Sequence, residues 1–327
     1  MTRLSVRRES WKLAQVFTIS RGSRTVAEVV VAELHGGALR GRGEAVPYAR
    51  YGETVDGVVT ALEAMGEAVA GGLDRAGLQS AMPAGAARNA LDGAFWDLEA
   101  KETGTSIWEL AGIEGTPHPI VTAYTLSLDT PERMGAAAQE HATRPLLKIK
   151  LTGDGDLDRV RAVRAGAPKA KLIVDANEGW TVQHLRDYGT VLAELGVALI
   201  EQPLPAAQDA ALAEVPHPVP ICADESCHTT GDLERLQGLY DAVNIKLDKT
   251  GGLTEALKLK AEARHRGFKI MIGCMVGSSL AMAPAMLLAQ DAEFVDLDAP
   301  LLLAHDRQPG LRYEGSIVYP PKPNLWG

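Results

Sequence analysis

The 327-residue chain has little cysteine, no excess of positive charge and no long apolar segment. Three cysteines, an odd number in a chain of this length, do not make a disulfide framework, so we expect a reduced, cytoplasmic protein. The formal net charge of −9 argues against nucleic acid or an anionic membrane as the main partner. No apolar run approaches the roughly 20 residues that span a membrane, and residues 1–15 lack the apolar core of a signal peptide.

The sequence does contain ample apolar material, 46% of all residues, and it is arranged differently in two parts of the chain. Residues 4–34 hold two strand-like stretches, the clearer being VAEVVVAEL at 26–34, joined by the polar SRGSRT at 20–25. In the segment 85–101 a buried helix face is predicted by apolar residues at helical spacing, namely Ala87, Ala90, Leu91, Ala94, Phe95 and Leu98. Strands followed by helices predict a small α+β domain over residues 1–115, ending near GIEGTPHP.

A different rhythm begins at about residue 119. Eight short apolar or β-branched runs alternate there with helical stretches: IVTAYTL, LLKIKL, KLIVDAN, VALIEQP, VPICADES, AVNIKLD, KIMIGCM and FVDLDAP. Eight such repeats in fewer than 200 residues predict an α/β fold of the β/α-barrel type over residues 116–310. The alternative is an open doubly wound sheet, but its glycine-rich phosphate-binding turn is missing. Residues 311–327 form a C-terminal segment that we expect to return to the first domain.

Polar side chains occupy the ends of these predicted strands. They are Lys148 and Lys150 on the second run, Asp175 on the third, Glu201 on the fourth, Asp224 on the fifth, Lys246 on the sixth and Asp298 on the eighth. From Lys150 to Lys246 the steps are 25, 26, 23 and 22 residues, each one strand–helix unit long, which places these side chains at one mouth of a barrel. Each carboxylate alone could instead cap the following helix, but the common register disfavours that alternative for the whole set.

The three carboxylates of this set offer only oxygen ligands. Asp175, Glu201 and Asp224 therefore favour Mg²⁺ or Mn²⁺ over zinc, and the eight histidines show no metal-binding spacing. Beside a cation and partly out of water, a lysine ammonium loses its proton more readily, so Lys150 and Lys246 are candidate bases. Inversion at a carbon next to a carboxylate requires one base on each face of a planar intermediate. The pattern predicts a metal-assisted epimerase or racemase.

Five ordered motifs resemble the enolase superfamily, muconate-lactonising subgroup: KIK (148–150), VDANEGW (174–180), EQPLP (201–205), ADES (223–226) and NIKLDKTGG (244–252). The resemblance implies an N-terminal α+β capping domain, a modified TIM barrel of the (β/α)7β type and one Mg²⁺ per subunit, with Mn²⁺ as an alternative. By this resemblance the three carboxylates bind the metal and the two lysines form the acid/base pair. Lys148 would lie beside the substrate carboxylate.

Asp296 and Asp298, in DLDAP, resemble the paired acids of dipeptide epimerases, which hold the free α-ammonium of the dipeptide. The alternative is that one of them only caps a following turn. Similarity to the bacterial L-Ala-D/L-Glu epimerase family extends over nearly the whole chain and includes PYARYGET (47–54), MPAGAARNALD (82–92) and HPVPICADESCHT (217–229). The implied activity is epimerisation of L-Ala-D-Glu and L-Ala-L-Glu through an enolate, in the recycling of murein peptides.

Further candidate pocket residues are an arginine, a threonine and the segment of the seventh strand. In that family an arginine of the early capping loop contacts the glutamyl carboxylate; here it would be Arg24 or Arg21, with Arg24 preferred and two merely solvated arginines as the alternative. Thr125 matches a substrate-contacting threonine, and Cys274, with Met275, is a candidate for the pocket wall. The expected partner is a small dipeptide, and the sequence leaves open whether the chain forms a homo-oligomer.

Two other hypotheses stay open at this point. The first is an N-acylamino acid racemase or an o-succinylbenzoate synthase-type lyase on the same scaffold, because reaction type varies within one fold. The second is a non-catalytic metal-binding barrel, against which the intact Lys150 and Lys246 speak.

Overall fold

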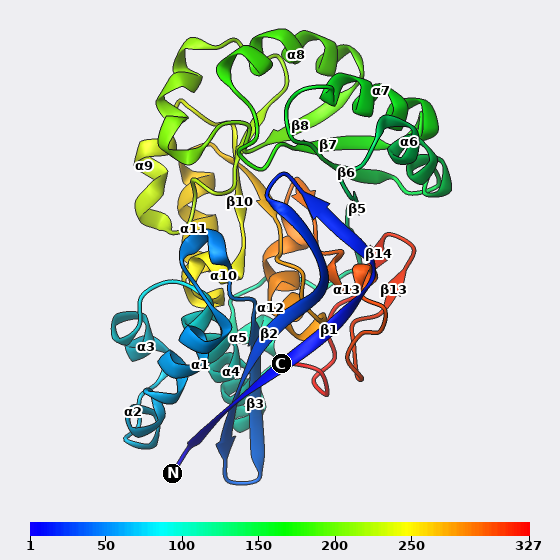
Figure 1. Cartoon of the computed structure of the whole chain (residues 1–327). Helices are drawn as coiled ribbons and strands as arrows, with labels where there is room; N and C mark the ends of the chain where they lie inside the picture. Colours follow the sequence, from blue (N-terminus) through cyan, green and yellow to red (C-terminus); the bar gives the residue numbers. More distant parts are fainter.

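The computed structural model describes every residue, 1–327. Its N-terminal part is an antiparallel sheet in the order β1-β2-β3, formed by β1 Arg3–Ile19, β2 Gly22–Gly36 and β3 Leu39–Ala45. The two predicted strands are confirmed; the third, LRGRGEA, has charged and small residues where a strand signal would have β-branched ones. The β1–β2 hairpin is long, and Figure 1 shows its tip reaching the barrel.

Helices follow this sheet and pack on it. They are α1 Val55–Glu63, α2 Gly66–Ala70, α3 Arg75–Ala81, α4 Ala86–Thr103 and α5 Ile107–Leu110, after a 3₁₀ turn η1 at Ala49–Tyr51. The helix predicted over 85–101 is α4, and its Ala90, Leu91 and Ala94 are buried against the sheet. This close packing requires glycine in β3, because a Cβ on Gly43 would lie 2.1 Å from the Ala90 carbonyl oxygen.

Eight parallel strands form the second part, in the sheet order β12-β11-β10-β9-β8-β7-β6-β5. They are β5 Tyr124–Leu126, β6 Leu146–Lys150, β7 Lys171–Asp175, β8 Val197–Glu201, β9 Ile221–Ala223, β10 Ala242–Ile245, β11 Lys269–Ile272 and β12 Phe294–Val295. The sheet curls until its two edges meet, where the Ala123 amide donates to the Val295 carbonyl at 2.8 Å. The predicted TIM-like α/β barrel with an N-terminal α+β capping domain is confirmed.

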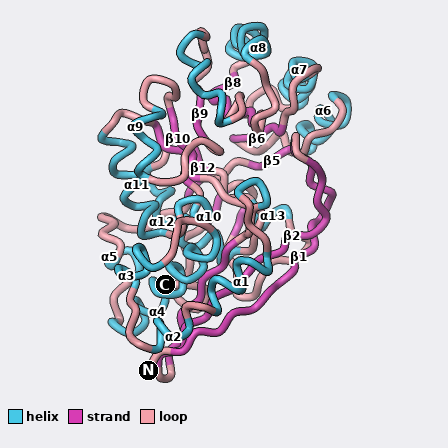
Figure 2. Tube along the Cα trace, turned by 60° about the vertical axis from the view of Figure 1, so that its left-hand side comes forward, coloured by secondary structure: helices cyan, strands magenta, loops and turns pink.

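Helical segments connect the strands, and Figure 2 shows α6, α7 and α8 on the outside of the sheet. The segments are α6 Pro131–Glu140, α7 Asp156–Gly166, α8 Val182–Glu194, η2 Ala206–Glu214, η3 Thr230–Asp232, α9 Leu233–Leu236, α10 Leu247–Thr250, α11 Leu253–His265, α12 Ser279–Leu288, η4 Ala289–Asp291 and α13 Ala299–Leu302. Between β8 and β9 the connection is 3₁₀ rather than α-helical, so the alternation of strand and α-helix is interrupted once there.

The first predicted barrel strand, IVTAYTL, is divided between two sheets. Its start, β4 Ile120–Val121, pairs with β14 Ile317–Val318, which also pairs with β13 Tyr313–Glu314. Only β5 belongs to the barrel, because the chain changes partners at residues 122 and 123: the Thr122 amide donates to Ser316 and the Ala123 amide to Val295. A continuous apolar run carries no signal for such a change of partner.

The capping domain is joined to the barrel through the segment that follows β10. Arg88 of α4 donates to the Gly251 carbonyl at 3.0 Å, and Asn89 donates to Asp248 Oδ1 at 2.9 Å. Gly251 and Gly252 both have positive φ and lie against α4; a Cβ on Gly252 would lie 2.5 Å from Asp92. The glycine pair is thus required for close packing of the two domains.

The last residues of the chain lie against the capping domain. The Trp326 indole donates to the Gly93 carbonyl at 2.9 Å, and Arg42 donates to the Leu325 carbonyl at 2.6 Å.

Among all the helices, none combines the length and the apolar character that crossing a membrane would require.

Candidate active site

The strand ends meet in one pocket at the barrel mouth, under the capping hairpin. Nine of the eleven predicted site residues line it: Arg24, Thr125, Lys148, Lys150, Asp224, Lys246, Cys274, Asp296 and Asp298. The other two, Asp175 and Glu201, lie beneath the pocket and have no exposed surface. Strand register explains the convergence, since Lys150 pairs with Asp175 and Asp175 pairs with Glu201 on successive parallel strands.

Lysines and carboxylates alternate on the floor of this pocket. Three of its ion pairs are 2.6 Å long: Lys150–Asp175, Lys148–Glu201 and Lys246–Asp224. Lys148 also lies 3.2 Å from Asp175 Oδ2 and so links two carboxylates. The three carboxylates are at most 2% exposed, and a buried charge without a partner costs several kcal/mol, so the pairing is needed.

Charges in this cluster shift one another's pKa values. Burial alone would raise the pKa of Asp175, but the two neighbouring lysines lower it to about 2. Burial and the Asp175 charge raise the pKa of Glu201 to about 7. Burial opposes the charge of Lys246, yet Asp224 and Glu201 raise its pKa well above the ordinary lysine value. The side chains alone thus favour the ammonium form of Lys246 and do not produce the readier proton loss expected from the sequence.

Supporting polar residues that the sequence analysis missed hold the carboxylates in place. Lys249 is fully buried and lies 2.6 Å from Asp224 Oδ1, while it also donates to the Asn244 carbonyl at 2.9 Å. The side-chain amide of Asn244 donates to Glu201 Oε1 at 2.8 Å. A signal for Lys249 exists in KLDK: three residues after Lys246, one turn of α10 brings it back to the same carboxylate.

The paired acids after β12 are held by Thr125. Its backbone amide donates to Asp298 Oδ2 at 2.6 Å, and its hydroxyl donates to Asp296 Oδ1 at 3.4 Å. Asp296 has a cation partner in Lys148 at 2.8 Å, whereas Asp298 has none. Burial and the neighbouring Asp296 charge raise the pKa of Asp298 to about 7. This corner can therefore accept a further cation from a bound molecule.

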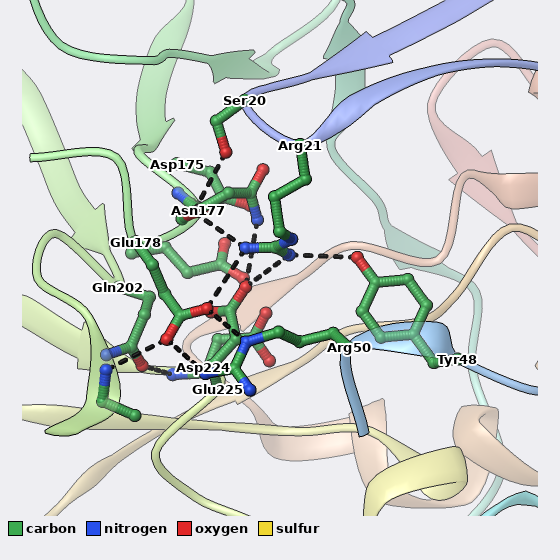
Figure 3. Close-up of polar contacts among 12 residues, drawn as sticks. Ser20, Arg21, Tyr48, Arg50, Asp175, Asn177, Glu178, Gln202, Asp224 and Glu225 are labelled. Carbon is green, nitrogen blue, oxygen red and sulfur yellow. Dashed lines mark hydrogen bonds and ion pairs between the residues drawn. The ribbon is translucent and has the colours of Figure 1, made fainter. Parts of the chain in front are cut away.

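The two candidate arginines of the capping hairpin differ in their contacts. Arg21 donates to Glu225 Oε1 at 2.7 Å, to the Tyr48 hydroxyl at 3.0 Å and to the Asn177 carbonyl at 2.8 Å (Figure 3). Arg24 has no carboxylate partner, and its guanidinium carbon lies 5.3 Å from the centre of the Tyr48 ring. Arg24 is thus the guanidinium that remains available to an anion in the pocket.

The segment after β11 forms a further wall of the pocket, with Cys274 and Met275 both lining it. Met275 packs against Val29 and Val46 of the capping domain, so this wall is supported from the sheet above. Burial raises the pKa of the Cys274 thiol well above its ordinary value, which makes it an inert, apolar wall residue. Tyr51 also lines the pocket and was missed, although it lies in the PYARYGET motif.

The donor chemistry of the floor fits a hard divalent cation. No three acidic, histidine or cysteine side chains form a preformed metal cage, because lysine ammonium groups stand between the carboxylates. The carboxylates nevertheless lie at the ends of three adjacent strands and present only oxygen atoms. Glu201 Oε2 receives no well-directed hydrogen bond, although Lys148 Nζ lies 2.6 Å away. Such a poorly satisfied buried oxygen is suited to a metal ion.

Both parts of the chain match known sequence families. Residues 1–112 match the mandelate racemase/muconate lactonizing enzyme N-terminal domain, and residues 133–321 match the family described as enolase C-terminal domain-like. Together these matches cover most of the chain. The protein belongs to the enolase superfamily, in its mandelate racemase/muconate lactonizing group.

Individual relatives narrow the comparison. The chain is 48% identical over 315 residues to the L-Ala-D/L-Glu epimerase of Escherichia coli (strain K12), which covers 96% of this chain and 98% of the relative. It is 46% identical over 289 residues, 88% of this chain and 91% of the relative, to an N-acetyl-D-glutamate racemase of a Pseudoalteromonas species. A solved enolase family member from Agrobacterium tumefaciens with homology to dipeptide epimerases, holding sodium and L-Ala-L-Glu, is 56% identical, covers 100% of both chains and superposes with a TM-score of 0.98.

Proposed function

We propose that this chain is a Mg²⁺-dependent epimerase, an isomerase that inverts the α-carbon of the glutamyl residue in L-Ala-D-Glu and L-Ala-L-Glu. The observation that carries the proposal is the placement of Lys150 at the end of β6 and Lys246 just after β10. These strands are four apart in the eight-stranded barrel and so lie on opposite sides of its mouth, with the three carboxylates on the strands between them. The names of two similar proteins support the substrate class.

In the proposed reaction the two lysines exchange roles with the direction of turnover. Lys150 or Lys246, as a neutral amine, takes the α-proton from one face, and the other lysine, as an ammonium, delivers a proton to the opposite face. One C–H bond breaks and one forms, so no oxidant or reductant is needed. Asp175, Glu201 and Asp224 would hold Mg²⁺, with Mn²⁺ as the alternative. When bound, the metal supplies positive charge opposite the charge that develops on the substrate carboxylate.

Other pocket residues would orient the dipeptide. Asp298, which lacks a cation partner, and Asp296 would take the α-ammonium beside Thr125. Arg24 would pair with the glutamyl side-chain carboxylate, since its guanidinium has no acidic partner within the chain. Lys148 would lie beside the reacting carboxylate, and Cys274 would form the wall. In this orientation the protein's carboxylates face the substrate ammonium, and Arg24 faces the glutamyl side-chain carboxylate.

The biological setting we propose is the cytoplasmic recycling of murein peptides. D-Glutamate joined to L-alanine is not a product of ribosomal synthesis, so a dipeptide of this kind points to peptidoglycan as the source. The similarity to the L-Ala-D/L-Glu epimerase of Escherichia coli supports this setting. Deletion of the gene should leave cells unable to use L-Ala-D-Glu as a glutamate source, and normal growth on it would argue against this role.

A solvent-exchange experiment tests the activity. Mg²⁺-loaded protein in D₂O should incorporate deuterium at the glutamyl α-carbon of both diastereomers and interconvert them, as followed by mass spectrometry and NMR. The control is the same protein after the metal has been removed with a chelator, which should lose both exchange and inversion. Absence of exchange with every Xaa-Glu dipeptide, in protein shown to bind Mg²⁺, would rule out the proposal.

A second candidate function is racemisation of N-acylated glutamate, because one relative at 46% identity is named an N-acetyl-D-glutamate racemase. N-Acetylglutamate has no ammonium group for Asp298 to bind. Asp298→Asn should therefore reduce epimerisation of L-Ala-L-Glu strongly while leaving any racemisation of N-acetylglutamate nearly unchanged. If wild-type protein turns over N-acetylglutamate faster than the dipeptide, the second function is the main one.

A further inference from the structure

Three non-glycine residues adopt left-handed backbone conformations, and all three follow the strands that carry predicted metal ligands. Asn177 has φ 45° and Glu178 φ 66° in the loop after β7, and Gln202 has φ 33° just after β8. For side chains other than glycine this conformation costs roughly 1 kcal/mol or more, so surrounding contacts must hold it. Gln202 is held within the barrel, where its side chain donates to Ser226 and Tyr240. Figure 3 shows that the contacts to Asn177 come instead from Ser20 and Arg21 at the tip of the capping hairpin.

Arg21, at the hairpin tip, makes the contacts that connect the two domains here. It donates to the Asn177 carbonyl at 2.8 Å in the loop after β7 and to Glu225 Oε1 at 2.7 Å in the loop after β9. Ser20 adds a hydrogen bond of 3.0 Å to the same Asn177 carbonyl. The Tyr48 hydroxyl, 3.0 Å away, holds the other side of the guanidinium. One side chain thus bridges two barrel loops and the capping domain.

The loops after β7 and β9 adjoin Asp175 and Asp224, two of the three carboxylates of the pocket floor. The backbone amide of Asn177 donates to Asp175 Oδ1 at 2.9 Å, so the loop conformation sets the orientation of that carboxylate. Glu225 directly follows Asp224, and its side chain is 1% exposed. Arg21 therefore contacts the neighbours of both Asp175 and Asp224 without touching either.

Glu225 provides a second, independent observation. Its Oε2 atom is buried and receives no hydrogen bond, and Arg21 is its only ion-pair partner. If the hairpin tip moved away, this carboxylate, which directly follows Asp224, would lose its only ion pair. A buried carboxylate that loses its only cation is strongly unfavourable, so the hairpin tip and the loop after β9 stabilise each other.

From these contacts we propose that Arg21 is a positioning residue that joins closure of the capping hairpin to the geometry of the metal site. Docking of Arg21 orders the loops beside Asp175 and Asp224, and the ordered loops hold the hairpin tip over the pocket. Arg24, three residues further along the hairpin, is thereby placed over the substrate. The inference rests on the proposed function for its metal and substrate, but the docking itself needs neither.

Arg50 offers a matched control on the same face. Its guanidinium donates to both oxygens of Glu178 at 2.7 and 2.8 Å, so it also joins the capping domain to the loop after β7. Its side chain is 39% exposed, and such pairs are typically worth little. It does not reach Glu225. If any arginine that joins the two domains could hold the hairpin tip in place, Arg50→Met should have the same effects as Arg21→Met.

The test compares Arg21→Met, Glu225→Gln, the double variant and Arg50→Met, after circular dichroism and thermal unfolding have shown that each is folded. Calorimetric titration with Mg²⁺ alone should show affinity reduced about 10-fold or more for Arg21→Met, in the range found for residues that support metal ligands. Hydrogen exchange of residues 19–24 should become faster in the same variant. Arg50→Met should change the affinity less than about twofold. The double variant should lose no more Mg²⁺ affinity than the more impaired of the two single variants, because both substitutions remove the same interaction.

Steady-state kinetics distinguish a positioning role of Arg21 from a role in stability alone. Arg21→Met should lower kcat as well as raise KM, because the metal site is disturbed, and Arg21→Lys should restore part of the hairpin protection. The inference fails if Arg21→Met keeps Mg²⁺ affinity within twofold and leaves exchange of residues 19–24 unchanged, or if its effect and that of Glu225→Gln simply add. If wild-type protein binds no Mg²⁺, the proposed function fails instead, and hairpin exchange alone then decides the role of Arg21.

Discussion

The floor and the roof of the active-site pocket come from different domains and differ in burial and pairing. The floor consists of strand-end side chains of the barrel, where Asp175, Glu201 and Lys148 are at most 1% exposed and tightly ion-paired. The roof consists of the capping hairpin, where Arg21 is 26% exposed and Arg24 has no acidic partner. A buried ion pair is costly to break from either side, whereas Arg24, which has no acidic partner, can be replaced with little loss of stability. This difference agrees with the proposed division of roles, with proton transfer by floor residues and substrate selection by the roof.

The largest expected effect is in the floor. Lys150→Met and Lys246→Met should each reduce epimerisation by roughly 10²–10⁴-fold, the usual contribution of a positioned acid or base. Because the lysines lie on opposite sides of the mouth, each variant should still exchange the α-proton of one diastereomer in D₂O, and the two variants should keep opposite ones. Retention of exchange with the same diastereomer would show that the lysines do not act on opposite faces.

Removing a proposed metal ligand should have the next largest effect. Glu201→Gln should weaken Mg²⁺ binding by at least about 100-fold, since even residues that only support metal ligands typically contribute 10–100-fold. The metal-free variant should unfold at a temperature close to that of wild type, because the side chain keeps its shape and Lys148 keeps Asp175 and Asp296 as partners. Calorimetry with Mg²⁺ measures the first quantity and differential scanning calorimetry the second. Unchanged affinity would exclude Glu201 as a ligand.

A change in the roof should affect selection rather than chemistry. Arg24→Met should lower kcat/KM for L-Ala-L-Glu by about 10–100-fold, as expected when a hydrogen bond to a charged group, worth about 1.5–3 kcal/mol, is lost. Turnover of a dipeptide with an uncharged C-terminal side chain should change less than about threefold. An equal loss with both substrates would mean that Arg24 acts on the pocket as a whole and would remove the distinction between floor and roof.

The smallest effect concerns the joint between the two domains, where Asp248 is buried and accepts a hydrogen bond from the Val46 amide at 2.9 Å. Burial, with Glu53 and Glu44 nearby, raises the pKa of Asp248 to about 7. The folded protein then holds a proton that the unfolded chain has released, so this residue's contribution to stability falls as pH rises from about 4 to about 7. Asp248→Asn should unfold a few °C, roughly 2–4, above wild type at pH 8, and the difference should be clearly smaller at pH 5. A constant difference at both pH values would contradict this assignment.

Sequence reasoning succeeded wherever a residue's place follows from a repeating unit. The steps of 25, 26, 23 and 22 residues placed the lysines and carboxylates at one barrel mouth, and the structure brings them together there. Sequence reasoning failed where the spatial neighbours of a segment do not follow from the strand–helix repeat. The run from 120 to 126 is split between two sheets, because β14, from the far end of the chain, pairs with its first residues. Lys249 was overlooked although its spacing from Lys246 carried a signal.

The sequence by itself determined the barrel, the capping domain and the set of strand-end acids and bases, because apolar periodicity and strand spacing are local properties of the chain. Only the tertiary structure decided which arginine is engaged and which is available. Arg21 and Arg24 lie three residues apart near the tip of one hairpin, and no local pattern distinguishes them. The difference arises from Glu225 and Asn177, more than 150 residues away, which take the hydrogen bonds of Arg21 and leave Arg24 without an acidic partner. Charge pairing across a domain interface depends on packing, which no local pattern records.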